Sequence, residues 1–370
     1  MELLNKGIYT IISESVFLLF FLTFLISLVF VGALYYFDVM SIKKANEAIS
    51  AKQASHDRPT SRLGGLATIM ALVIGACFMA DQFIFFILLS STPVLVVGAL
   101  EDIGYNITPG NRFYAGLASG FVAVYLTGLW IDDVDFTILT PILSLPFIAI
   151  CFTVFASAGV SNSINLIDGV NGLASGVIVI IGSALCLISF SIGEIGLGTF
   201  CVILVGSILG FFIWNFPKGL IFLGDAGAYT YGHLLVWIAI SLVSKHPEIS
   251  AWAIFCIFFW PILDTVAAIL RRTLKQSSIN HADHMHFHQL LMRIVVIYSG
   301  GRILQKSANP VSTIIILPFC ILTSFLGVLF LKNSIFSILT IIIATFLFFG
   351  SYYLMIFSVK SKALRKLMKN

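Results

Sequence analysis

The chain has 370 residues, of which 59% are hydrophobic and 10% are charged, and its formal net charge is +4. Its mean hydropathy is +1.04. Soluble domains carry charge on about a quarter of their residues, so this chain has too few charges to cover a water-facing surface. The composition excludes a soluble globular protein and gives no sign of nucleic-acid binding. The six cysteines lie singly in apolar segments without a CxxC pair, which argues against a zinc site or a disulfide framework.

Taken in chain order, apolar runs of near-bilayer length predict about eleven transmembrane helices, some of them short. The runs are 16–36, 64–79, 83–99, 113–130, 142–158, 173–190, 199–214, 226–243, 252–269, 311–330 and 335–357. The first run is too long for a signal peptide, lacks a small-residue cleavage signature and is followed by further spans. We therefore expect an all-α integral membrane protein in which residues 1–370 form a single polytopic domain.

The basic residues predict the orientation. With the N-terminus outside, the cytoplasmic segments are 37–63, 100–112, 159–172, 215–225, 270–310 and 358–370. Of the 21 Lys and Arg residues, only Lys6, Lys245 and Lys332 then fall outside. Because basic residues accumulate in cytoplasmic loops, this distribution predicts an outside N-terminus and a cytoplasmic C-terminus.

Five polar segments lie on the predicted cytoplasmic side. They are Ser55–Gly65, Gly98–Asp102 followed by Arg112, Asn162–Ala174, Phe222–Gly227 and His281–Gln289. Carboxylates at the membrane edge are costly and usually mark a functional path or a bound cation. Several carboxylates that converge with Arg and His side chains suit a magnesium diphosphate, because oxygen ligands hold Mg²⁺ while basic groups neutralise the remaining phosphate charge.

Other interpretations of these residues remain open. Any one carboxylate could be a solvated helix cap, the histidine block could be a solvated loop, and His233 inside a span could be a packing residue. A secondary transporter or a lipid-linked sugar flippase is the main alternative, but it predicts midplane charges and inverted repeats, which are not evident. A CDP-alcohol phosphotransferase would need Asp-Gly-x-x-Ala-Arg, and Gly172-Leu173 breaks that pattern after Asp168-Gly169.

In this order, the five segments resemble the polyprenyl-phosphate N-acetylhexosamine-1-phosphate transferase family, also called glycosyltransferase family 4. The most specific blocks are Asn-Leu-Ile-Asp-Gly-Val-Asn-Gly-Leu-Ala at 165–174 and Phe-Leu-Gly-Asp-Ala-Gly at 222–227. Two positions depart from the family pattern: Glu101 stands where Asp is common, and Gln289 stands where a last His is common. The Ser-His-x-Arg-Pro-Thr-x-Arg pattern at 55–62 favours the branch that initiates O-antigen or capsule chains.

The resemblance implies transfer of an N-acetylhexosamine 1-phosphate from a UDP-sugar to undecaprenyl phosphate, with release of UMP. The site would face the cytoplasm at the bacterial inner (plasma) membrane and begin a cell-envelope glycan. The implied metal is Mg²⁺, with Mn²⁺ as an alternative. The implied partners are UDP-N-acetylhexosamine, undecaprenyl phosphate and membrane lipids, and a homodimer is left open. The implied site residues are Asp225 and Asp102 for the metal; Glu101, Asp102, Asp168, His286 and His288 for catalysis; and Arg58, Arg62, Arg112, Asn165 and Asn171 for substrate binding.

Overall fold

The computed structural model describes residues 2–48, 60–275, 285–299 and 305–360, and within these ranges it contains α-helices and no strands. The predicted all-α class is confirmed. The helices are α1 (Glu2–Ala48), α2 (Gly64–Cys77), α3 (Gln82–Ser90), α4 (Thr92–Asp102), α5 (Pro109–Thr127), α6 (Thr140–Leu143), α7 (Pro146–Leu166), α8 (Leu173–Ser191), α9 (Ile195–Asn215), α10 (Gly224–Lys245), α11 (Ala251–Ile257), α12 (Phe259–Lys275), α13 (Phe287–Tyr298), α14 (Gln305–Leu329) and α15 (Ser334–Lys360).

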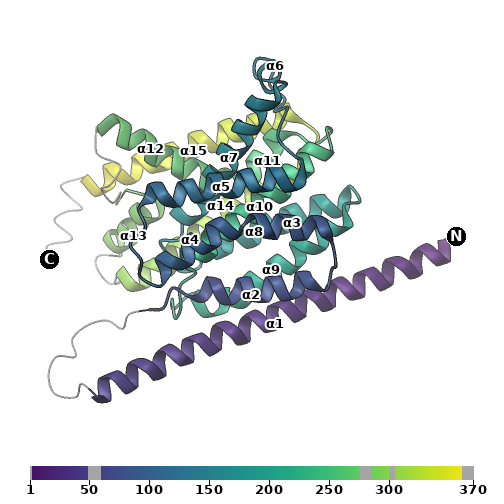
Figure 1. The fold of residues 1–370 in the computed structure, drawn as a ribbon. Coiled ribbons are helices and arrows are strands. Elements are labelled where there is room, and N and C mark those ends of the chain that lie inside the picture. The colour runs from purple at the N-terminus through teal and green to yellow at the C-terminus, as the bar shows by residue number, and fades with distance from the viewer. Residues whose placement is uncertain (1, 49–59, 276–284, 300–304, 361–370) are drawn as a thin grey trace.

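Helix α10 forms the centre of the bundle, and α2, α4, α7 and α8 pack around it (Figure 1). Nearly all its side chains are buried, including the large Tyr231 and Trp237. A helix that is apolar on nearly every face is stable only when other helices surround it. The central position of α10 follows from this pattern. Because α10 is central, several neighbouring helices hold its N-terminal end in place.

Seven described helices are long and apolar enough to cross a membrane, or nine if each of two bent helix pairs is one span. The membrane class is therefore confirmed, while the count of about eleven spans stays a prediction. Each predicted run coincides with a helix or a bent pair. The difference in number arises because α2 has only 14 residues and α5 is not among the seven.

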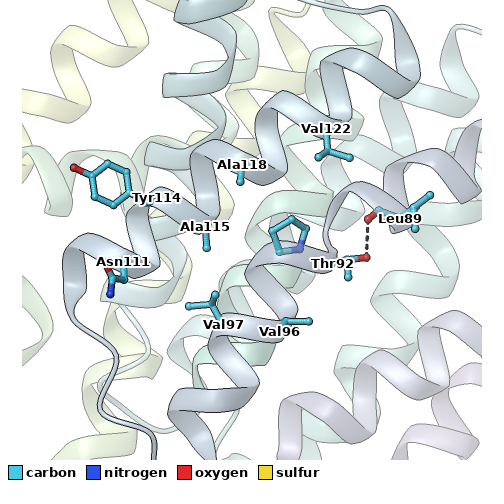
Figure 2. Close-up of a pocket in the computed structure, with 10 residues that line it drawn as sticks. Leu89, Thr92, Val96, Val97, Asn111, Tyr114, Ala115, Ala118 and Val122 are labelled. Carbon is cyan, nitrogen blue, oxygen red and sulfur yellow. Dashed lines mark hydrogen bonds between the residues drawn. The ribbon is translucent and has the colours of Figure 1, made fainter.

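Two predicted spans are broken. The pair α3–α4 bends by 43° and the pair α11–α12 bends by 82°. At the first break, Pro93 lacks the N–H that would continue the helix, and the Ser91 and Thr92 hydroxyls donate to the carbonyls of Leu88 and Leu89 at 2.7 Å. An apolar hollow of about 640 Å³ lies between α3, α4 and α5, and its lining contains no acidic or basic side chain. Figure 2 shows the side chains that line it.

The described parts of the polar segments gather at one end of the bundle, where α4 ends and α5 and α10 begin (Figure 1). Helix α15 ends on the same side, whereas α6 and the start of α1 lie at the opposite end. The first residue of α5 is Pro109, and Thr108 caps this helix by accepting the Asn111 N–H at 3.3 Å. Which end faces the cytoplasm stays a prediction.

Candidate active site

The segment before α2 pairs with the segment before α10. Phe222 N–H donates to the Ser61 carbonyl at 2.9 Å, and Gly65 N–H donates to the Leu223 carbonyl at 2.8 Å. This approach requires a glycine, because a Cβ on Gly65 would lie 2.3 Å from the Leu223 oxygen and 2.5 Å from the Gly227 Cα. The pairing brings the exposed Arg62 next to the loop that leads to Asp225.

The last residue of α4, Asp102, caps the N-terminus of α10. Its Oδ1 accepts the Asp225 N–H and its Oδ2 accepts the Ala226 N–H, both at 2.9 Å. A carboxylate at this position satisfies backbone donors that the helix leaves free and interacts favourably with the helix dipole. Gly98, one turn earlier in α4, allows the contact, since a Cβ there would lie 2.6 Å from the Ala226 Cα. Asp102 therefore sets the position of Asp225.

Asp225 lies in the first turn of α10 and is held by two donors. Its Oδ2 forms an ion pair with the Arg112 guanidinium at the start of α5, and its Oδ1 accepts the Asn165 amide N–H at 3.1 Å. Asn165 lies in the last turn of α7, not in a loop as the predicted segment 159–172 implies. Three of the predicted site residues thus meet at one carboxylate, and they come from three different helices.

Asp168 lies in the short segment between α7 and α8, close to this group. Burial raises its pKa well above the usual value, and the negative charges of Asp225 and Asp102 raise it further, while the Arg62 charge opposes the shift. The three carboxylates therefore lie within electrostatic reach of one another. Such a group is stabilised by a cation, either a basic side chain or a metal ion.

A polar pocket of about 270 Å³ lies at this group of residues. Its lining residues are Arg62, Asn165, Asp168, Gly169, Val170, Asn171, Asn215, Phe222, Gly224, Asp225 and Asn309. The predicted residues Arg62, Asn165, Asp168, Asn171 and Asp225 are among them, and Asp102 is not. Both acidic and basic side chains face the same small volume, which suits a ligand that carries phosphate groups.

Two asparagines of the pocket were not predicted from the sequence. Asn309 Oδ1 accepts the Asn171 N–H at 2.7 Å, and Asn215 Oδ1 accepts the Gly172 N–H at 2.6 Å. Both side chains hold the 168–172 segment in place. Asn215 ends α9 and Asn309 stands before Pro310 in α14, so neither forms part of an acidic or histidine-rich motif that would have drawn attention to it.

Glu101 is not among the described residues that line the pocket. The Glu101 carboxylate accepts the Ile107 N–H at 2.7 Å and so closes the turn between α4 and α5. It also interacts electrostatically with Arg112, so it could act on the site indirectly. Arg58 lies outside the described residues. The catalytic role of Glu101 and the substrate-binding role of Arg58 stay predictions.

The histidines His286 and His288 are both buried, 5% and 1% exposed. His286 Nδ1 lies 2.8 Å from Asp264 Oδ2, and the two imidazole rings stack with centroids 5.6 Å apart. A Cβ on Gly169 would lie 2.6 Å from His288 Nε2, so this ring packs directly on the residue after Asp168. Burial lowers the pKa of His288 to about 4, which leaves this ring neutral at neutral pH.

The donor chemistry of the pocket fits a magnesium ion that also binds substrate. Among the described residues, no three His, Cys, Asp or Glu side chains are grouped so that they could hold a metal ion by themselves. Mg²⁺ is commonly bound by one or two carboxylates together with substrate phosphates. Asp225 and Asp168 both line the pocket and supply such carboxylates. Asp102 would join them only through oxygens that already accept two backbone N–H groups.

A long apolar groove of about 510 Å³ lies beside the polar pocket. Its walls come from α5, α7, α10, α11 and α12. At one end Phe113 follows Arg112 in sequence and Asn162 precedes Asn165 by one turn of α7, and at the other end the groove reaches Ile131 and Val134. The groove therefore runs along the bundle from the polar end toward the opposite end, and its wall is almost wholly hydrocarbon.

A polar, phosphate-compatible pocket beside an apolar groove in a helical bundle is the arrangement that a membrane enzyme with an amphiphilic substrate needs. Residues 84–243 match the glycosyl transferase family 4 model. The chain is 31% identical over 267 residues to the probable undecaprenyl-phosphate N-acetylglucosaminyl 1-phosphate transferase of Bacillus subtilis (strain 168), covering 68% of this chain and 74% of that protein.

Two further relatives are phospho-N-acetylmuramoyl-pentapeptide-transferases. The one from Staphylococcus carnosus (strain TM300) is 27% identical over 300 residues, which is 74% of this chain and 90% of that protein. The one from Clostridium perfringens (strain 13 / Type A) is 30% identical over 252 residues, which is 62% of this chain and 76% of that protein. The chain belongs to glycosyl transferase family 4, the family that its sequence motifs resemble, and it is a sugar-phosphate transferase enzyme.

Proposed function

We propose that this enzyme transfers N-acetylhexosamine 1-phosphate from a UDP-sugar to undecaprenyl phosphate and releases UMP. The observation that carries this proposal is that Asp225, which Arg112 of α5 holds by an ion pair, lines a polar pocket, and that α5 and α7 also form walls of the apolar groove. The pocket would take the diphosphate and nucleoside, and the groove would take the isoprenoid tail. The printed names of the relatives, which include undecaprenyl phosphate, support the acceptor.

In the proposed reaction, an oxygen of the lipid phosphate attacks the phosphorus that carries the sugar. The bond from that phosphorus to the bridging oxygen breaks, and UMP leaves with the electron pair. Asp225, with Asp168 or Asp102, would hold Mg²⁺, which neutralises the phosphate charge that grows on the departing group. Arg112 fixes the Asp225 carboxylate, and Arg62 and Asn171 lie where they can contact phosphate or nucleoside groups.

The donor is proposed to be UDP-N-acetylglucosamine or a close N-acetylhexosamine relative, because the B. subtilis relative is named for that sugar. The reaction would begin a cell-envelope glycan, such as an O-antigen or a capsule, at the cytoplasmic face of the plasma membrane. Mg²⁺ is proposed as the metal, and Mn²⁺ should substitute for it.

The test is UMP release by the purified full-length protein in detergent, with undecaprenyl phosphate, Mg²⁺ and a panel of UDP-N-acetylhexosamines. We expect release that requires both the lipid and the metal and that EDTA abolishes. If folded protein releases no UMP from any donor and binds none of them, the proposal is wrong, and the transporter interpretation becomes the better one.

The apolar groove gives a separate prediction for the acceptor. Gly159 of α7 lines it, and a Cβ added there meets no atom within 4 Å, so a larger side chain would project into the groove. Gly159→Phe should raise KM for undecaprenyl phosphate at least about tenfold by displacing apolar contact with the tail, and KM for the UDP-sugar should not change. The measurement is initial velocity against each substrate.

Gly159→Ala is the matched control, because its methyl group occupies little of the groove, and it should change KM for the acceptor only slightly. An acceptor with a shortened isoprenoid tail, which fills less of the groove, should be affected less by Gly159→Phe than the full-length lipid. Equal KM values for wild type and Gly159→Phe with the long acceptor would show that the tail lies elsewhere.

A further inference from the structure

Asp264 is a buried carboxylate that no sequence motif includes. It lies in α12, it is 1% exposed, and it faces the N-terminal end of α13. Its Oδ2 is 2.8 Å from His286 Nδ1, and its Oδ1 accepts the Phe287 N–H at 3.0 Å. Both carboxylate oxygens are therefore used to hold two consecutive residues at the start of α13.

This contact determines how the His286 ring is presented. An ionised carboxylate can only accept hydrogen bonds, so His286 Nδ1 must carry the proton that it shares with Asp264. The Nε2 atom then remains as the ring nitrogen for contact with a ligand, and which nitrogen is protonated follows from the bond made by the other. Asp264 therefore selects one tautomer and one ring orientation.

Apolar packing holds the same junction. The Phe287 ring packs against Trp260 of α12 and Phe348 of α15, with centroid distances of 4.8 and 5.0 Å. The Tyr352 hydroxyl donates to the Met285 carbonyl at 2.9 Å, just before His286. The histidine segment is thus anchored on both sides, which limits the ring to a narrow range of positions.

Helix α12 also forms part of the apolar groove. Ile262, Val266 and Ile269 line the groove, while Asp264 lies on a different face of the same helix and holds His286. From His286 the chain of contacts continues through the stacked His288 ring to Gly169, next to Asp168. One helix therefore connects the groove wall to the histidines and to the acidic segment of the polar pocket.

We propose that Asp264 is a positioning residue that acts through His286: its carboxylate fixes the ring so that Nε2 is directed to the diphosphate of the substrates. This inference rests on the proposed function. It adds a residue to the site, and it explains why an acidic side chain is kept inside an apolar helix, where an unpaired charge would be costly.

The kinetic test uses the purified full-length protein and the variants Asp264→Asn, His286→Gln and their combination. The asparagine keeps the size of the side chain but can present an N–H to Nδ1, which favours the wrong tautomer. We expect Asp264→Asn to lower kcat by about ten- to a hundredfold, less than the roughly 10²–10⁴-fold that a positioned proton-transfer group itself contributes, because Asp264 acts only through His286. KM for both substrates should stay within about twofold. The double variant should be no slower than His286→Gln alone, because residues that act as a unit are not additive.

Asp81→Asn is the matched control. Asp81 also accepts two backbone N–H groups at a helix start, those of Phe83 and Ile84 at 2.8 and 3.2 Å, but it begins α3 at the opposite end of the bundle from the polar pocket. It should lower thermal stability without lowering kcat. The proposal is overturned if Asp264→Asn keeps the wild-type kcat, or if the double variant loses the product of the two single effects.

A spectroscopic readout needs neither activity nor a folded Asp264 variant. Protein labelled with ¹⁵N-histidine, assigned by comparison with His286→Gln, reports which ring nitrogen of His286 carries the proton. We expect a protonated Nδ1 and an unprotonated Nε2. A protonated Nε2 would overturn the inference, whereas absence of UMP release with the expected tautomer would count against the proposed function alone.

Discussion

Replacing Asp225 with asparagine should lower the rate of transfer at least about a hundredfold, the scale on which loss of one preorganised electrostatic group acts. In the wild type the two carboxylate oxygens face donors from Arg112 and Asn165. An amide would direct its own N–H₂ group at one of these donors, and it would remove the negative charge that holds a metal ion. The measurement is kcat for UMP release at saturating donor and acceptor.

The control is Asp133→Asn, the same chemical change at an exposed carboxylate in the segment between α5 and α6. Asp133 Oδ1 accepts the Thr140 hydroxyl at 2.7 Å, and this bond lies at the end of the bundle opposite the polar pocket. Asp133→Asn should keep nearly full activity. Both variants should elute as single species and unfold within a few degrees of the wild type. An active Asp225→Asn enzyme would remove Asp225 from the account of catalysis.

Gly65→Ala should destabilise the protein and also inactivate it. The new Cβ would meet backbone atoms, at 2.3 Å from the Leu223 oxygen and 2.5 Å from the Gly227 Cα, and backbone yields less readily than a flexible side chain. Overpacking of this kind typically costs about 1–3 kcal/mol. Relief of the clash would move α2 away from the start of α10, and with it Arg62 away from Asp225. The measurements are the midpoint of thermal unfolding in detergent and kcat for UMP release.

Gly350→Ala is the matched helical control. Gly350 lies in α15, and a Cβ there meets no atom within 4 Å. Alanine has a higher helix propensity than glycine by up to about 1 kcal/mol, so this change should leave stability unchanged or raise it. Opposite signs for the two glycine-to-alanine changes are expected. An equally small effect of both would mean that the close approach of α2 and α10 does not support the site.

The convergence of the acidic motifs could be predicted because each motif stands at a helix end. Asp102 ends α4, Asp168 follows α7 and Asp225 begins α10. Short connections between apolar spans leave such residues few positions, so motifs on one side of a bundle must lie close together. The composition and the long uninterrupted apolar runs sufficed for the helical membrane class, because a membrane β-barrel would instead show short segments of alternating hydrophobicity.

The particular partners could not be predicted, because they depend on which helices touch. Glu101 and Asp102 are adjacent in sequence, yet one closes a turn at Ile107 and the other caps α10. Consecutive residues of a helix point in different directions, so the two side chains contact different neighbours. Helix limits also differ from the predicted ones: α7 continues to Leu166 and so carries Asn165 in regular structure.

Asp264 did carry a signal in the sequence. It lies inside the apolar run 252–269, and an acidic residue within a predicted span usually has a partner and a function. The sequence does not identify that partner, since His286 is 22 residues away and the pairing depends on how α12 meets the start of α13. Asn215 and Asn309 carried no comparable signal, because single asparagines at helix ends are common caps.

The most direct test of the central claim is the mass of the lipid product. Purified enzyme, undecaprenyl phosphate, Mg²⁺ and UDP-N-acetylglucosamine would be incubated, and the extracted lipid examined by mass spectrometry. The proposed reaction predicts a lipid heavier than the acceptor by one N-acetylhexosamine 1-phosphate unit, formed in a one-to-one ratio with UMP. Unchanged lipid, or UMP formed together with free sugar phosphate and no lipid product, would contradict a transfer to the polyprenyl acceptor.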